Sequence, residues 1–235
     1  MIKEAIVLAG GLGTRLRSVA KDLPKLMVDV NGKPFLEYVL SYLEKEGIER
    51  VILSVGYKWE TIFEYFGNKF KNLELVYSVE TVPLGTGGAI KLALEKTQGD
   101  EIFVLNGDVY FGINLAELYS YHKEKKSNLT LALKEMRNFD RYGVTEIDAN
   151  GRIIKFSEKM YRTYGLINGG RYVIDKKFFM SFNLPDKFSI EKDFFEVYYN
   201  DYKFYGKKFD NYFIDIGIPE DYEKAKKDFE EFANK

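Results

Sequence analysis

The first half of the chain alternates between short apolar runs and longer segments whose apolar residues recur every three or four positions. The short, β-branched runs predict buried strands, and the amphipathic segments predict helices. The expected strands are 6–8, 26–30, 50–55, 74–79 and 101–105, with an Asn31-Gly32 turn after the second. The expected helices run from Pro34 to a stop at Gly47, and over 59–66, 86–96 and 114–125. Such alternation favours a mostly parallel sheet covered by helices on both faces.

The pattern changes near residue 129, where the apolar runs become shorter and more closely spaced. It predicts strands at 129–133, 143–147 and 153–156, the last two joined by a hairpin turn at 148–151. Further strands are expected near residues 172 and 204, and helices over 176–181, 189–200 and 219–233. Because the sequence has no internal repeat and no low-complexity linker, we expect one continuous domain over 1–235 with a mixed second half.

Composition excludes several classes of protein. The net charge is −1 with no basic run, which argues against broad binding to the nucleic-acid backbone. The absence of cysteine excludes disulfides and thiolate metal sites. The sequence contains neither a signal-peptide pattern nor an apolar run of membrane-spanning length, so we expect a cytoplasmic protein without a membrane segment. The single histidine, His122, is expected on the surface of its helix.

A glycine-rich bend directly follows the first strand. Gly10, Gly11 and Gly13 allow the backbone to turn tightly, and successive N–H groups in such a bend can bind phosphate oxygens. Arg15 and Lys25 add the positive charge that a polyphosphate requires. The alternative is a purely structural strand-to-helix turn, which would have no need of two cations.

Two known phosphate-binding patterns do not fit this bend. A P-loop requires Gly-Lys-Ser/Thr, which is missing after the glycines. The dinucleotide-binding fingerprint requires an acid near the end of the second strand, but that strand is followed by Gly56 and Tyr57. The sequence therefore disfavours a nicotinamide-dependent oxidoreductase and favours another nucleotide-handling loop.

Two acidic residues are candidates for holding a metal ion. Asp108 follows the buried strand 101–105, so it is expected at the same edge of the sheet as the glycine bend. Asp215 lies within an apolar run, where a carboxylate is costly unless it is paired or binds a cation. Two carboxylates beside a polyphosphate loop, without a cluster of Cys or His, point to Mg²⁺.

Six motifs occur in an order that resembles the sugar-1-phosphate nucleotidylyltransferases. They are Gly10-Gly-x-Gly-Thr-Arg-Leu with Pro24-Lys25, Pro83-Leu-Gly-Thr-Gly-Gly88, Asn106-Gly-Asp108, Phe156-Ser-Glu-Lys159, Asn168-Gly-Gly170 and Asp215-Ile-Gly-Ile-Pro-Glu-Asp-Tyr222. The resemblance spans nearly the whole chain. It implies an α/β fold with a Rossmann-like mixed, mostly parallel sheet sandwiched by helices. It also implies a nucleotide-binding half (1–128), a sugar-binding half (129–235) and Mg²⁺-dependent joining of a nucleoside triphosphate to a sugar 1-phosphate.

The same resemblance implies a role for individual residues. Catalytic residues would be Arg15, Lys25, Asp108 and Asp215, the two aspartates also holding the metal ion. The nucleotide would contact Leu8, Ala9, Gly10, Gly11, Gly13, Thr14, Glu80, Pro83, Gly85 and Thr86. The sugar phosphate would contact Gly143, Glu158, Lys159, Asn168 and Gly169, although this chain has Asn-Gly-Gly where the family often has Asn-Ala-Gly. An oligomer such as a homodimer would form through this catalytic domain, because the carboxy-terminal β-helix of some relatives is absent.

Glu80 bears on the choice of base. An ionised carboxylate only accepts hydrogen bonds, and guanine offers adjacent N1–H and N2–H₂ donors, so we expect GTP. UTP, CTP and dTTP are the alternatives if Glu80 instead faces solvent. Segments 13–25 and 33–38 further resemble the D-glycero-D-manno-heptose 1-phosphate guanylyltransferases of bacterial surface-polysaccharide (capsule and lipopolysaccharide) pathways. Mannose 1-phosphate is the alternative sugar substrate, and a non-catalytic regulator that binds sugar nucleotides is the alternative of another class.

Overall fold

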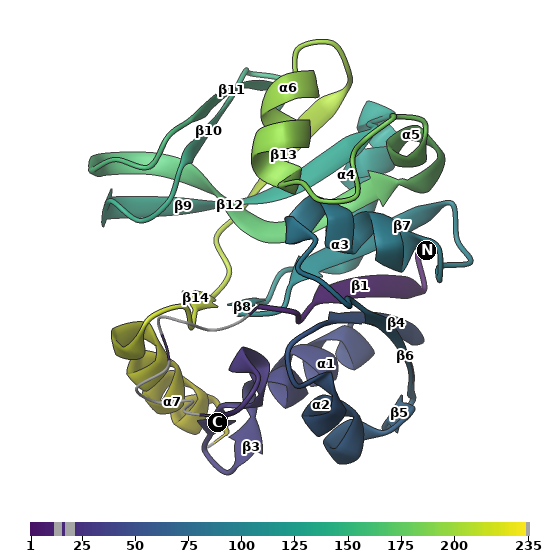
Figure 1. Cartoon of the computed structure of the whole chain (residues 1–235). Helices are drawn as coiled ribbons and strands as arrows, with labels where there is room; N and C mark the ends of the chain where they lie inside the picture. Colours follow the sequence, from purple (N-terminus) through teal and green to yellow (C-terminus); the bar gives the residue numbers. More distant parts are fainter. Residues whose placement is uncertain (12–15, 17–21, 234–235) are drawn as a thin grey trace.

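A ten-stranded mixed sheet forms the centre of the computed structural model, which describes residues 1–11, 16 and 22–233 (Figure 1). Its middle consists of parallel strands, with β1 (Glu4–Leu8) between β4 (Arg50–Val55) and β7 (Glu101–Asn106). Strand β6 (Leu73–Val79) continues the parallel part beyond β4, and the short β5 (Lys69–Phe70) closes that edge. The structure thus confirms four of the five strands expected in the first half of the chain, those at 6–8, 50–55, 74–79 and 101–105.

Helices cover both faces of the sheet. Neighbouring residues of β1 point to opposite faces, and each face packs against its own set of helices. Ala5 and Val7 pack in a core with α1 (Phe35–Lys45), α2 (Trp59–Phe66), α4 (Leu115–Lys125) and α7 (Pro219–Ala233). Ile6 packs in a second core with α3 (Gly85–Leu94), α5 (Lys176–Met180) and the π-helical turn Glu191–Phe195, which leads into α6 (Glu196–Tyr198). The predicted mixed, mostly parallel sheet sandwiched by helices is confirmed.

The second half extends the same sheet with long antiparallel strands. Strand β12 (Arg162–Asp175) pairs with β7 through its second part and with β9 (Leu129–Phe139) along much of its length. The hairpin of β10 (Val144–Ile147) and β11 (Ile153–Ser157) flanks β12, and β13 (Phe204–Phe209) runs parallel to β9. The predicted hairpin turn is confirmed, and Asp148 accepts the N–H groups of Asn150 and Arg152 at 2.8 Å each.

Several expected elements differ from the structure. The strand expected at 26–30 is a 3₁₀ turn (Lys25–Met27) followed by the two-residue strand β2 (Asp29–Val30), which pairs with β3 (Lys33–Pro34) across the Asn31-Gly32 turn. All three residues of that turn are buried, so its apolar run resembled a buried strand in the sequence. The helix expected over 189–200 begins as the π-helical turn, which buries both Phe194 and Phe195.

Two three-residue strands escaped prediction because they are too short to show a periodic pattern. They are β8 (Val109–Phe111) and β14 (Phe213–Asp215), which pair antiparallel in a small sheet of their own. In Figure 1 this small sheet lies between the large sheet and α7. Its importance is positional, because it brings Asp215 next to the end of β7.

The prediction for His122 was wrong, because this side chain is buried with only 1% of its surface exposed. It follows Leu115 and Leu118 along the buried stripe of α4, and its Nδ1 lies 2.9 Å from the hydroxyl of Thr130 on β9. Burial lowers the pKa of His122 to about 4. The charges of Glu101 and Asp175 oppose this shift, whereas that of Lys123 adds to it.

This burial predicts a loss of stability in mild acid. Between about pH 6.5 and pH 4 the unfolded chain takes up a proton on His122 that the folded chain does not, so the free energy of unfolding falls as the pH is lowered. A difference of two to three pKa units corresponds to about 3 kcal/mol. Urea unfolding near pH 7 and near pH 4.5 should show a smaller loss for His122→Leu than for the wild type. Equal losses in the two proteins would contradict the assignment.

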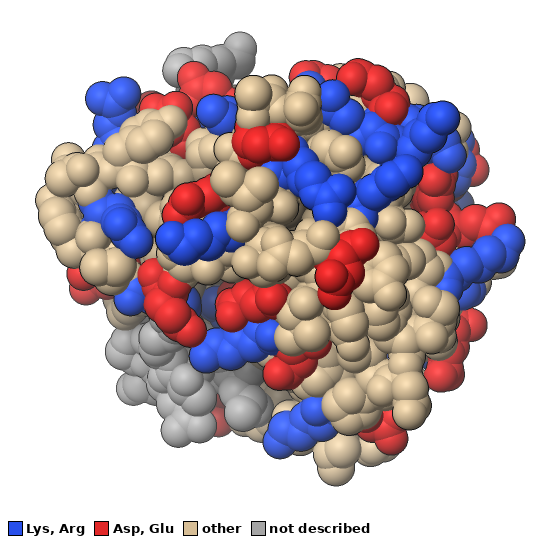
Figure 2. Space-filling model, turned by 90° about the horizontal axis from the view of Figure 1, so that it is seen from above, with Lys and Arg blue, Asp and Glu red and all other residues tan. Residues whose placement is uncertain are grey.

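The surface seen from above Figure 1 carries basic and acidic side chains intermixed (Figure 2). In the described part of that face, neither sign forms a continuous field of the kind that attracts a nucleic-acid backbone. Among the helices of the described residues, not one combines the length and the apolarity that crossing a membrane requires.

Candidate active site

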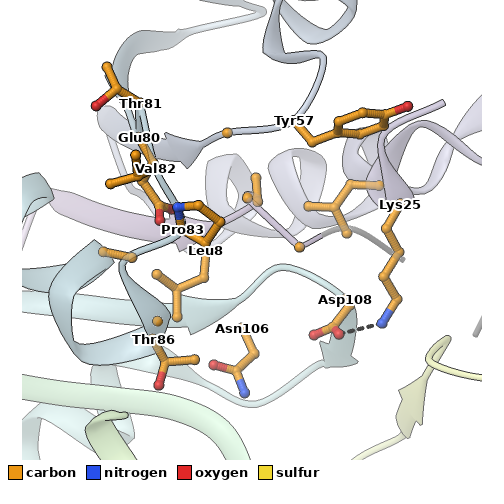
Figure 3. A pocket seen from close by; sticks show the side chains of 17 residues that line it. Leu8, Lys25, Tyr57, Glu80, Thr81, Val82, Pro83, Thr86, Asn106 and Asp108 are labelled. Carbon is orange, nitrogen blue, oxygen red and sulfur yellow. Dashed lines mark hydrogen bonds and ion pairs between the residues drawn. The ribbon is translucent and has the colours of Figure 1, made fainter. Parts of the chain in front are cut away.

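A pocket of about 750 Å³ opens beyond the carboxyl ends of the parallel strands (Figure 3). Each of these strands delivers part of its lining, because their ends meet at one edge of the sheet. The end of β1 and the segment after it contribute 8–11, and the segments after β4 and β6 contribute 56–57 and 80–83. Strand β7 with the following turn contributes Asn106 and Asp108. Lys25, Leu26 and the first turn of α3 complete it.

The glycine bend runs close to the side chain of Glu80. The N–H of Ala9 donates to the carbonyl of Ser54 at 2.7 Å, which holds the bend against β4. A Cβ on Gly10 would lie 2.7 Å from Glu80 Oε1. A glycine at this position therefore lets the carboxylate approach the backbone of the bend.

Glu80 is half-buried at the start of the loop between β6 and α3. Its Oε2 accepts the N–H of Leu84 at 3.0 Å, which fixes the carboxylate beside the amino end of α3. Burial raises the pKa of Glu80, while the hydrogen bond from Leu84 lowers it. In Figure 3, Glu80 and Pro83 lie at one end of the pocket, away from Lys25 and Asp108.

The opposite end of the pocket holds a charged pair. Lys25 donates to Asp108 Oδ2 at 2.5 Å, and the lysine is only 9% exposed. Asp108 projects from the turn that joins β7 to β8, where the N–H of Gly107 donates to the carbonyl of Leu8 at 3.0 Å. A Cβ on Gly107 would lie 2.5 Å from that same oxygen, so a glycine is required for the turn to approach β1 this closely.

Asp215 lies beside Asp108 although 107 positions separate them in the sequence. The pairing of β8 with β14 aligns Asp215 with Val109, and the N–H of Ile216 donates to the carbonyl of Asp108 at 3.0 Å. The carboxylate of Asp215 accepts the N–H of Gly217 at 2.7 Å and the hydroxyl of Tyr142 at 3.2 Å. Burial, followed by the negative charge of Asp108, raises the pKa of Asp215.

The chemistry of these groups fits a hard divalent cation. Two neighbouring carboxylates provide oxygen ligands, and their mutual repulsion is the kind of unfavourable interaction that a bound cation removes. Within the described residues, no three His, Asp or Glu side chains gather into a complete protein cage. An ion held by two carboxylates would take its remaining ligands from water or substrate, as Mg²⁺ commonly does.

The residues expected to contact the sugar phosphate lie outside the pocket lining. Asn168 and Gly169 lie on β12, where the Asn168 amide donates to the hydroxyl of Tyr172 at 2.9 Å and accepts the N–H of Gly170 at 2.9 Å. Gly143 precedes β10, and Glu158 and Lys159 are exposed after β11.

The structure brings together ten of the expected residues in the pocket: Leu8, Ala9, Gly10, Gly11, Lys25, Glu80, Pro83, Gly85, Thr86 and Asp108. Asp215 lies next to this group without lining the pocket. Gly13, Thr14 and Arg15 fall outside the described residues.

Sequence reasoning missed several residues at the site. Tyr57, Thr81 and Val82 line the pocket, and their only signal is that they follow β4 and β6 directly. Arg141, whose guanidinium lies 3.9 Å from Asp215 and 2.5 Å from Asp221, carries no local signal because both partners are more than 70 positions away.

Comparison with known proteins decides the family. Residues 4–231 match the family model described as nucleotidyl transferase. The chain belongs to the nucleotidyl transferase family. This nucleotidyl transferase is 50% identical over 229 residues to the D-glycero-alpha-D-manno-heptose 1-phosphate guanylyltransferase of Aneurinibacillus thermoaerophilus, which covers 97% of this chain and 99% of that protein. It is 34% identical to the mannose-1-phosphate guanylyltransferase of Mycobacterium tuberculosis over 96% of this chain and 64% of that protein.

The solved structures agree with the fold of this nucleotidyl transferase. The crystal structure of HddC from Yersinia pseudotuberculosis complexed with GMP-PN superposes with a TM-score of 0.85 and 38% identity. The alignment covers 97% of this chain and all of that protein. The same protein in its other crystal structure gives a TM-score of 0.87.

Proposed function

We propose that this nucleotidyl transferase moves a guanylyl group from GTP to D-glycero-α-D-manno-heptose 1-phosphate, giving the GDP-heptose and pyrophosphate. The observation that carries the proposal is the pocket at the strand ends, with the acceptor Glu80 at one end and the Lys25–Asp108 pair at the other. This separation matches a nucleotide, whose base and phosphates lie at opposite ends. The similarity to a heptose 1-phosphate guanylyltransferase over nearly the full length supports the choice of sugar.

The phosphate end of the pocket suits displacement at the α-phosphorus. An oxygen of the sugar phosphate forms a bond to this phosphorus while the bond to the β-phosphate oxygen breaks, and pyrophosphate leaves with that electron pair. Positioning and charge neutralisation account for most of the catalysis of such a reaction. Lys25 would neutralise phosphate oxygens of both substrates, and the N–H groups of Gly10 and Gly11 would donate to the triphosphate. Arg15 completes the proposed set as the contact for the leaving pyrophosphate.

Asp108 and Asp215 would hold Mg²⁺ in this proposal. When bound, the ion supplies positive charge to the α-phosphate oxygens and fixes their orientation. The protein's own contribution is to hold the two carboxylates next to each other and to place positive charge beside them. Lys25 lies 2.5 Å from Asp108, and its charge partly offsets the burial that raises the pKa of Asp215.

The second half of the chain (129–235) would bind the sugar phosphate, and the first half (1–128) the nucleotide. Gly143, Glu158, Asn168 and Gly169 would face the sugar hydroxyls, with Lys159 on the phosphate. The position of Asn168 supports this division. Asn168 donates to Tyr172 on the same strand, β12, and β12 pairs directly with β7. Strand β7 ends at Asn106, which lines the pocket.

A matrix of GTP, UTP, CTP and dTTP against heptose, mannose and glucose 1-phosphates, followed by pyrophosphate release, tests the proposal. We expect turnover with GTP and the heptose phosphate, and its loss in EDTA. Faster turnover with mannose 1-phosphate would favour the mannose-1-phosphate guanylyltransferase alternative, which the 34% identity to such an enzyme makes the second candidate. GTP binding without pyrophosphate release under any combination would refute the enzyme and favour a regulator.

Replacing Glu80 by glutamine should weaken the preference for GTP. The amide keeps one acceptor but turns an NH₂ donor toward the N–H edge of guanine, so kcat/KM for GTP should fall about tenfold or more relative to UTP. Glu95→Gln, at the exposed far end of α3, is the matched control and should change neither value. An undiminished preference for GTP in Glu80→Gln would remove this residue from base recognition.

A further inference from the structure

Arg171 is the largest fully buried side chain described in the protein, with 0% of its surface exposed. It lies on β12 opposite Leu105 of β7, and within the described part of the chain its guanidinium donates to backbone carbonyl oxygens alone. Nη1 donates to Asn106 and Gly170 at 3.1 Å each, and Nη2 donates to Val109 at 2.7 Å. Two of the three acceptors are therefore the first and last residues of the turn that carries Asp108.

This arginine lacks the partner that a buried cation normally has. Among the described residues, no carboxylate lies within 4.0 Å of its guanidinium. The guanidinium carbon lies 5.8 Å from the centre of the Tyr42 ring. Burial lowers the pKa of Arg171, and the charge of Asp108 opposes this shift. Burying an unpaired charge costs free energy, so an apolar residue would give a more stable fold at this position if the side chain had only a packing role.

The contacts of Arg171 complete the support of the Asn106–Val109 turn. On the side of β1, the N–H of Gly107 is held by the carbonyl of Leu8. On the side of β12, the two arms of the guanidinium span the carbonyl oxygens at both ends of the turn. The carbonyl of Asp108, between them, accepts the N–H of Ile216 and so connects the same turn to the strand that ends at Asp215.

We propose that Arg171 is a positioning residue for the metal-binding carboxylates. It fixes the Asn106–Val109 turn, and through the pairing of β8 with β14 it sets the separation of Asp108 and Asp215. This inference rests on the proposed function, because it concerns the divalent cation that the two carboxylates would hold. A planar guanidinium can bridge two carbonyl oxygens, which a single ammonium cannot do in the same way.

The test is the gain in GTP affinity that Mg²⁺ provides. Calorimetric titration with GTP, in the absence of sugar phosphate, is carried out in Mg²⁺ and in EDTA, and the ratio of the two dissociation constants is the gain. Residues that orient metal ligands typically alter metal affinity 10- to 100-fold. For Arg171→Met we expect this gain to be about tenfold smaller than in the wild type. Its affinity for GTP in EDTA should stay at the wild-type value. Arg171→Lys should lose a large part of the gain as well.

Arg152→Met is the matched control. Arg152 also donates to two backbone carbonyls, those of Asn200 and Tyr202, at 3.0 and 2.9 Å, but on the side of the sheet near β11 and β13. The melting temperature should fall for Arg152→Met and for the Arg171 variants. The gain in GTP affinity from Mg²⁺ should be lost only in the Arg171 variants. If Arg171→Met does not fold, Arg171→Lys decides the question.

Three results separate the possible failures. A wild-type gain in folded Arg171→Lys or Arg171→Met would overturn the positioning role. Equal losses of affinity in Mg²⁺ and in EDTA would also overturn it, because they indicate a damaged pocket. Absence of any gain in the wild type would instead refute the Mg²⁺ part of the proposed function, and with it this inference.

Discussion

An Asp108→Asn enzyme should lose about a thousandfold in kcat, with a much smaller change in KM for GTP. The substitution preserves the shape of the side chain but removes the negative charge that Asp108 presents beside Asp215. A divalent cation would then keep a single charged ligand from the protein, so countercharge at the α-phosphate would be lost in the transition state. Initial rates of pyrophosphate release over a range of Mg²⁺ concentrations measure the effect, which excess Mg²⁺ should only partly reverse.

Asp210→Asn is the control for this prediction. Asp210 also pairs with a lysine, Lys134, at 3.0 Å, but its side chain is fully exposed and does not line the pocket. Its substitution should leave kcat unchanged. A kcat for Asp108→Asn within tenfold of the wild type would show that this carboxylate does not hold a catalytic ion.

Replacing Lys25 by methionine should lower kcat/KM by a factor of about 10² to 10³. Methionine has a similar length and suits a side chain that is 9% exposed, so the main loss is the charge that would neutralise the phosphates. The variant should also shift the acid limb of the pH–rate profile to higher pH. Lys25 lowers the pKa of Asp215, and without it this carboxylate would become protonated, and release a cation, at a higher pH.

Lys134→Met offers the comparison. Its side chain is largely buried and has a single aspartate partner, as Lys25 has, but Lys134 lies on β9 and its partner Asp210 directly follows β13. We expect no change in kcat/KM and no shift of the pH profile. A Lys25→Met enzyme with a large loss of rate but an unshifted acid limb would separate the contact with phosphate from the effect on Asp215.

The sequence predicted the parallel half of the fold because its three central strands, β1, β4 and β7, are mainly apolar runs. The same reasoning placed Gly10 and Asp108 at one edge, since residues after neighbouring parallel strands share that edge, whereas Glu80 was assigned to the site by the family resemblance. What could not be predicted depends on contacts across the chain. Strand β14 is only three residues long, and nothing near Asp215 indicates that Tyr142 donates to it.

Buried polar residues were the second source of error. The pattern of α4 treats His122 as polar and therefore exposed, although it shares the stripe of Leu115 and Leu118. Arg171, about which the sequence analysis made no prediction, interrupts an apolar strand, and its acceptors are backbone carbonyls, which a sequence does not reveal. In both cases the tertiary partner, and not the residue type, determines burial.

The account depends on Asp108 and Asp215 holding one divalent cation against the phosphates of GTP. A crystal structure of the protein with Mg²⁺ and a GTP analogue that resists hydrolysis tests this most directly. The account predicts one ion bound by an oxygen of each aspartate and by a phosphate oxygen, at about 2.1 Å, with the guanine next to Glu80. A nucleotide bound in the pocket while Asp108 stays paired with Lys25 and Asp215 with Tyr142, with no ion between them, would contradict it.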